Sequence, residues 1–347
     1  METKIEIKNL YKIFGDNPTA MLEKVRNGLS KDDLNDQHNH VLGLSDINLK
    51  MPSKGIQVVM GLSGSGKSTL IRHINRLIEP TAGEVWIDGQ NVLDMDEKTL
   101  RNFRRNNASM VFQKFALLPH RSVMDNTIYG LEIQGIASKE AKKRAAYWID
   151  RVGLSGFEDN FPGQLSGGMQ QRVGLARALA TDADILLMDE AFSALDPLIR
   201  TDMQNILLDL QQELHKTIVF ITHDLEEALR IGDQIAILRD GEMIQQGTPQ
   251  DIVLKPHDDY IADFTRDINR GRVIQLKTIM NAPNDKPGPE LSGDMLVEDA
   301  AQLVTESPSS QGRVVNTDGE VIGVVDIKDL IRAMARPNME SRLEELE

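Results

Sequence analysis

A glycine-rich segment near residue 60 has the residue types and spacing of a phosphate-binding loop. It reads Gly-Leu-Ser-Gly-Ser-Gly-Lys-Ser-Thr over residues 61–69 and fits the pattern G-x-x-x-x-G-K-[ST]. Glycines let backbone N–H groups and the following helix N-terminus approach phosphate oxygens closely. Lys67 has the reach for the β- and γ-phosphates, and the Ser68 hydroxyl is a ligand for Mg²⁺. The alternative, a flexible glycine turn, is disfavoured because a strand-like segment precedes the loop and a helical one follows. The residues expected to contact a nucleotide here are Gly61, Ser63, Gly64, Ser65, Gly66, Lys67, Ser68 and Thr69.

Two consecutive carboxylates follow an apolar run later in the chain. Asp189 comes directly after the run Ile-Leu-Leu-Met at 185–188, and Glu190 is next. An aspartate at the end of such a strand can hold Mg²⁺ through water. A carboxylate one residue further can polarise an attacking water. The alternative is an acidic pair at an exposed strand end, and the phosphate-binding loop makes that interpretation the weaker one.

A second phosphate-binding turn is expected at Ser166, Gly167 and Gly168, which open a helix that continues through Val173 and Ala176. We call Ser166–Gly168 the signature turn. One phosphate-binding loop and one extra turn in the same chain indicate a composite site. In such a site, the signature turn of one copy closes over the nucleotide bound by another.

The segment Leu165–Arg172 resembles the signature motif of ATP-binding cassette (ABC) ATPases, with Met169 where the family usually has Gln. The resemblance implies four further roles. Phe14 stacks on adenine, and Gln113 reaches Mg²⁺ and the attacking water. Residues 193–196, Ser-Ala-Leu-Asp, match the D-loop, which crosses the dimer interface and ends at Asp196. His223 matches the switch histidine that contacts the γ-phosphate. The alternatives are a core residue for Phe14 and a structural histidine for His223.

Several segments narrow the resemblance to one importer branch, namely residues 10–15, 75–81, 115–120 and 188–200. That branch contains ATPase subunits of glycine betaine/proline/choline-type uptake systems, which import quaternary amines for osmoprotection; close relatives import histidine or trimethylamine N-oxide. The resemblance implies a peripheral subunit at the cytoplasmic face of the cell membrane. Its implied partners are a second copy bound head to tail, an integral-membrane permease docked by residues 114–130, and a periplasmic or tethered substrate-binding protein. ATP and Mg²⁺ are the implied cofactors, and no nucleic acid is expected.

The positioning elements indicate an α/β fold. Apolar runs at 56–60, 185–188 and 218–221, with a helical pattern over 201–215, are typical of a buried parallel sheet. Residues 4–10 alternate as in a half-buried strand, and polar residues 17–40 read as an exposed helical insertion. The resemblance adds an ABC ATPase core of the RecA-like type. In that core, an antiparallel β subdomain and a helical subdomain at about 114–178 belong to a domain spanning 1–270.

The C-terminal region is expected to form a small α+β domain over 276–347, which includes a proline-rich linker or long loop at 281–289. An Asp-Gly pair at 318–319 between β-branched runs predicts a hairpin within a β–α–β–β–α order. Residues 314–319 and 323–326 resemble the second half of a cystathionine-β-synthase (CBS) motif. Only one such motif fits between 290 and 347, so two interpretations stay open: a nucleotide sensor, or a packing and dimerisation module.

Composition limits the other classes of protein. The 347 residues carry 39 Lys+Arg and 53 Asp+Glu, a net charge of −14, which argues against coating nucleic acid. Cysteine is absent, so no disulfide framework or thiolate site is expected. No bilayer-length apolar run and no signal peptide are expected either. DNA-repair or translation-type ABC ATPases would need long coiled coils or a second cassette. His38 and His40 could form a metal site, but a polar loop is the favoured interpretation.

Overall fold

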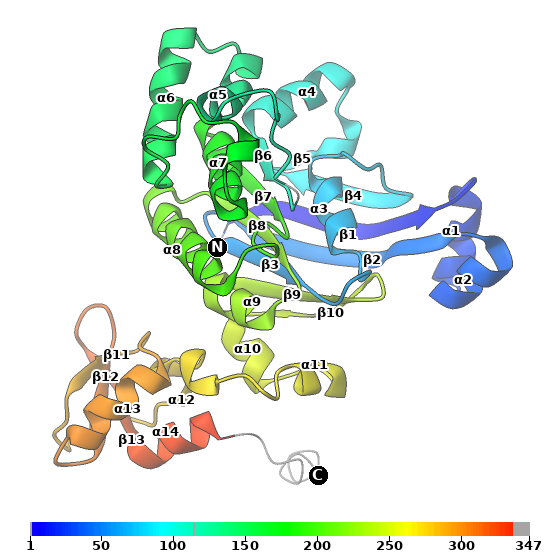
Figure 1. Ribbon diagram of the computed structural model, residues 1–347. Helices are drawn as coiled ribbons and strands as arrows, with labels where there is room; N and C mark the ends of the chain where they lie inside the picture. The colour runs from blue at the N-terminus through cyan, green and yellow to red at the C-terminus, as the bar shows by residue number, and fades with distance from the viewer. Residues whose placement is uncertain (1, 114, 336–347) are drawn as a thin grey trace. The chain divides into compact units, whose positions relative to one another are not determined.

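The computed structural model describes residues 2–113 and 115–335, and the chain divides into two compact units, Met1–Gln246 and Gly247–Glu347 (Figure 1). Residue 114, where the expected permease-docking segment begins, lies outside the described part of the chain. Residues 336–347, the end of the expected C-terminal domain, also lie outside it. Each unit is described by itself.

The first unit is built on a six-stranded sheet in the order β10-β9-β3-β8-β7-β6. Neighbouring pairs among β9, β3, β8, β7 and β6 run parallel. Every residue of β3, β7 and β8 is buried, because helices and a second sheet cover both faces. The strands are β3 (Ile56–Met60), β6 (Ala108–Val111), β7 (Ile185–Asp189), β8 (Thr217–Thr222), β9 (Gln234–Arg239) and β10 (Glu242–Gly247). The expected α/β fold is confirmed.

A second, antiparallel sheet in the order β2-β1-β4-β5 shares its core with the parallel sheet. Ile5, Ile7 and Leu10 of β1 pack in one cluster with Val59 of β3 and Leu187 of β7. The alternation of residues 4–10 therefore places one face of β1 in the core. The strands are β1 (Thr3–Phe14), β2 (Val41–Pro52), β4 (Ala82–Ile87) and β5 (Gln90–Asn91).

The insertion between β1 and β2 forms two helices, α1 (Thr19–Arg26) and α2 (Lys31–His38). It was expected to be helical and exposed. Its polar residues are exposed, but Leu22, Val25 and Leu34 are buried in a small cluster with Tyr11 and Ile13 of β1. The insertion is therefore a packed part of the antiparallel β subdomain.

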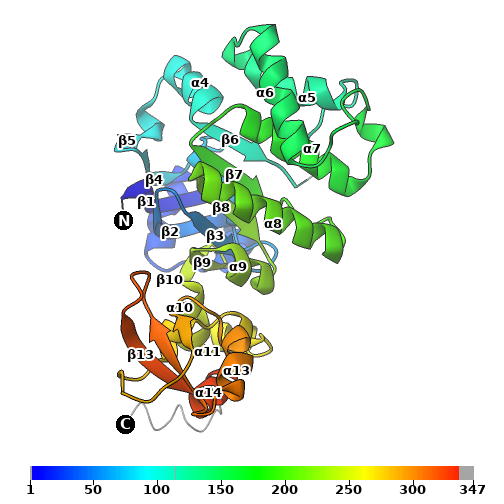
Figure 2. The same cartoon turned by 90° about the vertical axis from the view of Figure 1, so that its left-hand side faces the viewer.

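Helices α5, α6 and α7 pack against one another at one end of the first unit (Figures 1 and 2). This bundle is the helical subdomain expected near 114–178. Two further helices follow the sheet strands β7 and β8, and each begins at an aspartate that caps its first turn. The helices of the first unit after the insertion are α3 (Lys67–Ile74), α4 (Glu97–Asn106), α5 (Val123–Gln134), α6 (Ser138–Arg151), α7 (Gly167–Ala180), α8 (Pro197–Leu214) and α9 (Leu225–Ile231).

The second unit has the predicted β–α–β–β–α order around a three-stranded sheet, β11-β12-β13. Strand β11 (Glu290–Ser292) pairs parallel with β12 (Gln311–Val315), which pairs antiparallel with β13 (Val321–Asp326). The hairpin turns at Gly319, whose φ of 79° is accessible to glycine without strain. Helices α13 (Val297–Glu306) and α14 (Ile327–Met334) cover the sheet.

The second unit also contains residues 247–275, although the sequence predicts that the ATPase domain extends to residue 270. Leu254 and Ile274 pack into the same core as Leu291 and Val325. The short helices here are α10 (Pro249–Leu254), α11 (Asp259–Phe264) and α12 (Leu276–Ile279). Across the described residues of both units, we find no helix with the length and apolar character to cross a membrane.

Candidate functional site

The phosphate-binding loop joins the end of β3 to the start of α3, as the sequence predicts. Gly61 and Gly66 have φ angles of 150° and 100°, a region that side chains rarely adopt. A Cβ atom on Gly66 would lie 2.5 Å from the carbonyl oxygen of Gly43 on β2. Only glycine therefore fits at position 66, and a glycine-rich loop that leads into a helix N-terminus suits phosphate.

Lys67, the first residue of α3, points back into the loop rather than into solvent. Its Nζ donates hydrogen bonds to the carbonyl oxygens of Gly61 at 2.8 Å and Leu62 at 3.0 Å. Only 4% of the side chain is exposed, and Glu190 Oε1 lies 3.7 Å from Nζ. Burial lowers the pKa of Lys67, and the nearby Glu190 carboxylate partly offsets this effect. The ammonium group is therefore held where a phosphate oxygen would compete for its hydrogen bonds.

Oxygen ligands suitable for Mg²⁺ meet beside this lysine. Ser68 Oγ donates to Asp189 Oδ1 at 2.7 Å, joining α3 to the end of β7. Hydroxyl and carboxylate oxygens are the hard ligands that Mg²⁺ prefers, so the donor set fits this ion. Arg72, which no sequence motif singles out, also contacts this carboxylate, since its Nη2 lies 3.1 Å from Asp189 Oδ2. Arg72 is four residues after Ser68, so helical spacing alone could have placed it on the same face.

Glu190 is the point at which two other expected site residues converge. Gln113 Nε2 donates to Glu190 Oε2 at 3.0 Å, and His223 Nδ1 lies 3.6 Å from the same oxygen. The side chain of Glu190 is 18% exposed, and its φ of 46° is uncommon for a residue other than glycine. Such backbone conformations concentrate at functional sites. The carboxyl ends of β6, β7 and β8 thus bring together Gln113, Asp189, Glu190 and His223. With Lys67 and Ser68, which contact Glu190 and Asp189, these residues form what we call the Glu190 cluster.

The signature turn lies elsewhere in the chain. Ser166 caps α7 by accepting a hydrogen bond from Met169 N at 3.3 Å. A Cβ atom on Gly168 would lie 2.6 Å from Ile199 on α8, so this glycine permits close helix packing. Among residues 2–113 and 115–335, no hydrogen bond or ion pair joins the signature turn to the phosphate-binding loop. This placement agrees with a site completed by a second copy.

In the described part of the chain, no hydrogen bond or ion pair joins the other two expected nucleotide contacts, Phe14 and Asp196, to the Glu190 cluster. Phe14 ends β1 and is 39% exposed. The ammonium of Lys12 lies 4.9 Å from its ring centroid, and a Cβ on Gly43 would lie 2.7 Å from the ring. Asp196 at the end of the D-loop caps α8 by accepting from Ile199 N at 3.1 Å. An exposed aromatic ring fits a stacking role better than the core alternative does.

The imidazole rings of His38 and His40, in the insertion, contact other groups of the protein. Both ring nitrogens of His40 lie 2.6 Å from carbonyl oxygens, those of His38 and Asp16. His38 Nε2 lies 3.3 Å from Lys24 Nζ. In the described ranges, no group of three or more His, Cys, Asp or Glu side chains is arranged to hold a metal ion.

Comparison with known proteins decides the family. The ABC transporter family matches residues 44–193, and the CBS domain family matches 285–336. The glycine betaine/proline betaine transport ATP-binding protein ProV of Salmonella typhimurium is 46% identical, over 97% of this chain and 84% of ProV. The glycine betaine/carnitine transport ATP-binding protein GbuA of Listeria monocytogenes is 47% identical, over 93% of this chain and 80% of GbuA. The chain belongs to the ATP-binding subunits of ABC transporters.

A solved structure supports the fold of this ABC subunit. A dimeric ATP-binding cassette in a post-hydrolysis state, bound to ADP and Pi, is 32% identical and covers 71% of this chain and 98% of its own, with a TM-score of 0.61. The expected RecA-like core and the ATPase activity are thereby confirmed. The relatives are transport proteins, so the DNA-repair and translation alternatives are not supported.

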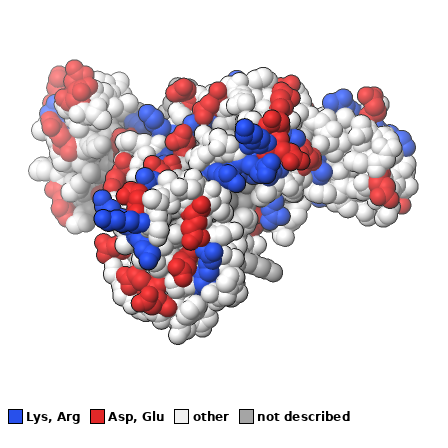
Figure 3. Space-filling model, turned by 90° about the horizontal axis from the view of Figure 1, so that it is seen from above, with Lys and Arg blue, Asp and Glu red and all other residues white. Residues whose placement is uncertain are grey.

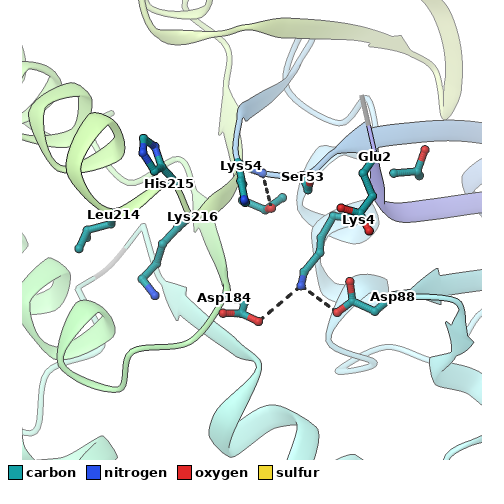
Figure 4. Close-up of a pocket in the computed structure, with 11 residues that line it drawn as sticks. Glu2, Lys4, Ser53, Lys54, Asp88, Asp184, Leu214, His215 and Lys216 are labelled. Carbon is teal, nitrogen blue, oxygen red and sulfur yellow. Dashed lines mark hydrogen bonds and ion pairs between the residues drawn. The ribbon is translucent and has the colours of Figure 1, made fainter.

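A polar cavity of about 230 Å³ lies at the amino ends of the parallel strands, whereas the phosphate-binding loop lies at their carboxyl ends (Figure 4). It is lined by residues that precede β3, β7 and β8, whereas the phosphate-binding loop follows the carboxyl end of β3. Lys4 bridges Asp88 at 2.8 Å and Asp184 at 3.5 Å across the cavity, and these carboxylates raise the pKa of Lys4 against the opposing effect of burial. The cavity is therefore separate from the nucleotide site.

Charged side chains of both signs are mixed over the face of the ABC subunit drawn in Figure 3. Lys and Arg alternate with Asp and Glu there, and no continuous basic surface covers that face. A nucleic-acid-binding face usually concentrates positive charge. This face therefore gives no support for nucleic-acid binding.

Proposed function

We propose that this ABC subunit hydrolyses ATP to drive import of a small methylated amine, of the glycine betaine and choline class, through a membrane permease. The geometry that supports hydrolysis best is the convergence of Gln113 and His223 on Glu190, at hydrogen-bonding distance for Gln113. A carboxylate held in this way can orient a water and accept its proton as the water attacks the γ-phosphorus.

The other residues bind and orient the nucleotide in this proposal. Residues 61–69 and the ammonium of Lys67 neutralise phosphate charge, and His223 contacts the γ-phosphate. Ser68, Gln113 and Asp189 would hold Mg²⁺, which would supply further positive charge against the phosphate oxygens. Phe14 stacks on adenine. The signature turn and Asp196 of a second copy complete the site. Catalysis is mainly positioning and electrostatic stabilisation, as expected for phosphoryl transfer.

The substrate class rests on the relatives. ProV and GbuA are named for glycine betaine with proline betaine or carnitine, and a relative in Bacillus subtilis that is 35% identical is named for choline. These compounds share a quaternary ammonium group. Trimethylamine N-oxide is a second candidate, because TmoW of Ruegeria pomeroyi is 45% identical over 93% of this chain and 94% of TmoW. Histidine has no comparable support among these relatives.

The same proposal includes the subunit's partners. A head-to-tail second copy, a permease docked near residues 114–130 and a substrate-binding protein would form the transporter at the cytoplasmic face of the membrane. The dimeric cassette and the names of the relatives support the first two partners. Opening and closing of the dimer would move the permease.

The test of hydrolysis is Glu190→Gln, which keeps the side chain's shape but removes the proton acceptor. We expect ATP binding to persist and turnover to fall at least ~100-fold. Glu226→Gln is the matched control, since Glu226 is exposed in the first turn of α9, three residues beyond His223. Near-normal turnover of Glu190→Gln would contradict the proposed role of Glu190.

The test of the substrate class is uptake of labelled solutes by cells that contain the subunit with its permease. Glycine betaine, proline betaine, choline, trimethylamine N-oxide and histidine would be compared, with Glu190→Gln as the inactive reference. We expect uptake of at least one methylated amine that depends on Glu190. Uptake of histidine alone would overturn the substrate class while leaving the ATPase assignment intact.

A further inference from the structure

A closed series of contacts surrounds Glu190 and connects the D-loop to His223. At one side, Ser193 Oγ donates to the carbonyl oxygen of Glu190 at 2.9 Å. The first residue of the D-loop is therefore bonded to the backbone of Glu190. At the other side, His223 Nδ1 lies 3.6 Å from Glu190 Oε2. The D-loop and the switch histidine therefore both lie next to Glu190, but they belong to separate segments of the chain.

Arg200, on the first turns of α8, is the side chain that joins these two segments again. Its Nη2 donates to the carbonyl oxygen of Leu195 in the D-loop at 3.3 Å. Its Nη1 donates to Asp224 Oδ2 at 3.0 Å, immediately after His223. A single planar guanidinium group thus fixes a D-loop carbonyl relative to the residue that follows the switch histidine.

Asp224 transmits this contact to His223 because both its backbone and its side chain are held by neighbouring residues. Asp224 N donates to Thr222 Oγ1 at 3.0 Å, and Asp224 Oδ1 accepts from Glu227 N at 3.2 Å as the cap of α9. His223 lies between these anchored residues. Movement of Asp224 would therefore move the imidazole relative to Glu190.

We infer that Arg200 is a positioning residue for ATP hydrolysis, which holds the D-loop and His223 in register around Glu190. Exposed ion pairs usually contribute little, but here the side chains of Arg200 and Asp224 are only 29% and 33% exposed. The guanidinium also serves acceptors on two different segments. The inference rests on the proposed roles of Glu190 and His223.

The experiment measures steady-state ATP hydrolysis by the full chain. Arg200→Ala is expected to lower kcat about 10-fold while the KM for ATP changes less than about 3-fold, since alignment and not nucleotide binding is lost. Arg200→Lys keeps the charge but lacks the planar fork that serves acceptors on two segments, so it should rescue only part of the loss, with kcat about 3-fold below the wild type. A purely structural role would not produce this separation of kcat from KM together with rescue by lysine.

A double-mutant cycle tests the pairing itself. Asp224→Asn keeps a capping side chain for α9 but removes the negative charge that faces Arg200. It should lower kcat about as much as Arg200→Ala does. The double variant should be no worse than either single variant, because residues that act as a unit give non-additive losses. Multiplicative losses would overturn the inference.

Arg230→Ala is the matched control. Arg230 also joins α9 to α8, through Gln204 Oε1 at 2.6 Å and Asn205 Oδ1 at 2.8 Å, but it contacts neither the D-loop nor Asp224. Its kcat should stay within about 2-fold of the wild type. An equal loss in Arg230→Ala would overturn the inference, and so would an unchanged kcat in Arg200→Ala. If Arg200→Ala does not fold, Asp224→Asn decides: a kcat about 10-fold lower with the KM for ATP changed less than about 3-fold supports the inference, and an unchanged kcat overturns it. Glu190→Gln, run in parallel, reports separately on the proposed function.

Discussion

At the scale of single residues, His73 is an ionisable group fully buried beneath the nucleotide site. It lies on α3 six residues after Lys67, and its Nδ1 donates to the carbonyl oxygen of Thr69 at 2.7 Å. Burial lowers the pKa of His73 from 6.5 to about 4. His73 of the unfolded chain therefore binds a proton below about pH 6.5, whereas His73 of the folded chain binds one only below about pH 4. Between these two pH values, the free energy of unfolding falls as the pH falls.

We predict that this single histidine costs about 2 kcal/mol of stability between pH 7 and pH 5. His73→Asn keeps a short polar side chain but does not titrate, so the loss of stability over that interval should shrink by this amount. Urea unfolding at both pH values measures it. His120→Asn, at an exposed histidine, is the control and should leave the pH dependence unchanged. An unchanged pH dependence in His73→Asn would contradict the prediction.

The sequence identified most residues of the Glu190 cluster because their chemistry depends on local order along the chain. Lys67 and Ser68 follow a recognisable glycine pattern, and Asp189 and Glu190 end an apolar run. Arg72 and Arg200 were missed. Each is an arginine on the polar side of a helix, a pattern common on any protein surface, and their partners are 117 and 24 residues distant in the chain. Only the fold shows these pairings.

At the scale of elements, the start of α7 tests whether the site is composite. Ser166→Arg removes the cap of α7, which costs about 1 kcal/mol, and places a long cation in the signature turn. We predict a folded protein with little ATPase activity. Mixed with Lys67→Ala, it should regain activity, because one of the two sites in each heterodimer then has an intact phosphate-binding loop and an intact signature turn.

Random pairing at equal concentrations would restore about a quarter of the wild-type sites. The control is the double variant Lys67→Ala/Ser166→Arg mixed with Lys67→Ala, a mixture in which no dimer contains an intact site. If the complementing mixture stays inactive although subunits exchange, the signature turn does not act on the nucleotide of a second copy.

Elements that are uniform along their length were predictable, and those that depend on distant contacts were not. Strands β3, β7 and β8 are continuous apolar runs, and the Asp-Gly turn fixed the hairpin β12–β13. The insertion reads as polar because its few apolar residues are spread over two short helices. That Leu22 and Leu34 meet Tyr11 depends on pairing that periodicity does not encode.

At the scale of the whole chain, the boundary between the two units was the least predictable feature. The proline-rich segment at 281–289 gave the strongest break in the sequence, which placed the expected boundary at 270–276. The compact units instead meet at Gln246 and Gly247. Composition did not reveal this, because residues 247–275 are ordinary helical sequence whose partners, such as Leu291 and Val325, come later in the chain.

The last prediction compares two truncations of the chain. A chain that ends at Gly247 keeps every residue from Phe14 to His223 that the proposed mechanism uses, together with all six strands of the parallel sheet. It should fold and hydrolyse ATP with a KM within about 5-fold of the full chain, a change worth about 1 kcal/mol of binding.

A chain that ends at Val273 should behave worse, although it is longer. It keeps Leu254 but loses Ile274, Leu291 and Val325, so a fragment of the second unit's core would be exposed to water. We expect lower solubility and a lower melting temperature than for the shorter chain, measured by size-exclusion chromatography and thermal unfolding. If the chain ending at Val273 is the better-behaved ATPase, the functional boundary lies near 270. If the shorter chain is soluble and dimeric but inactive, the second unit belongs to the catalytic unit.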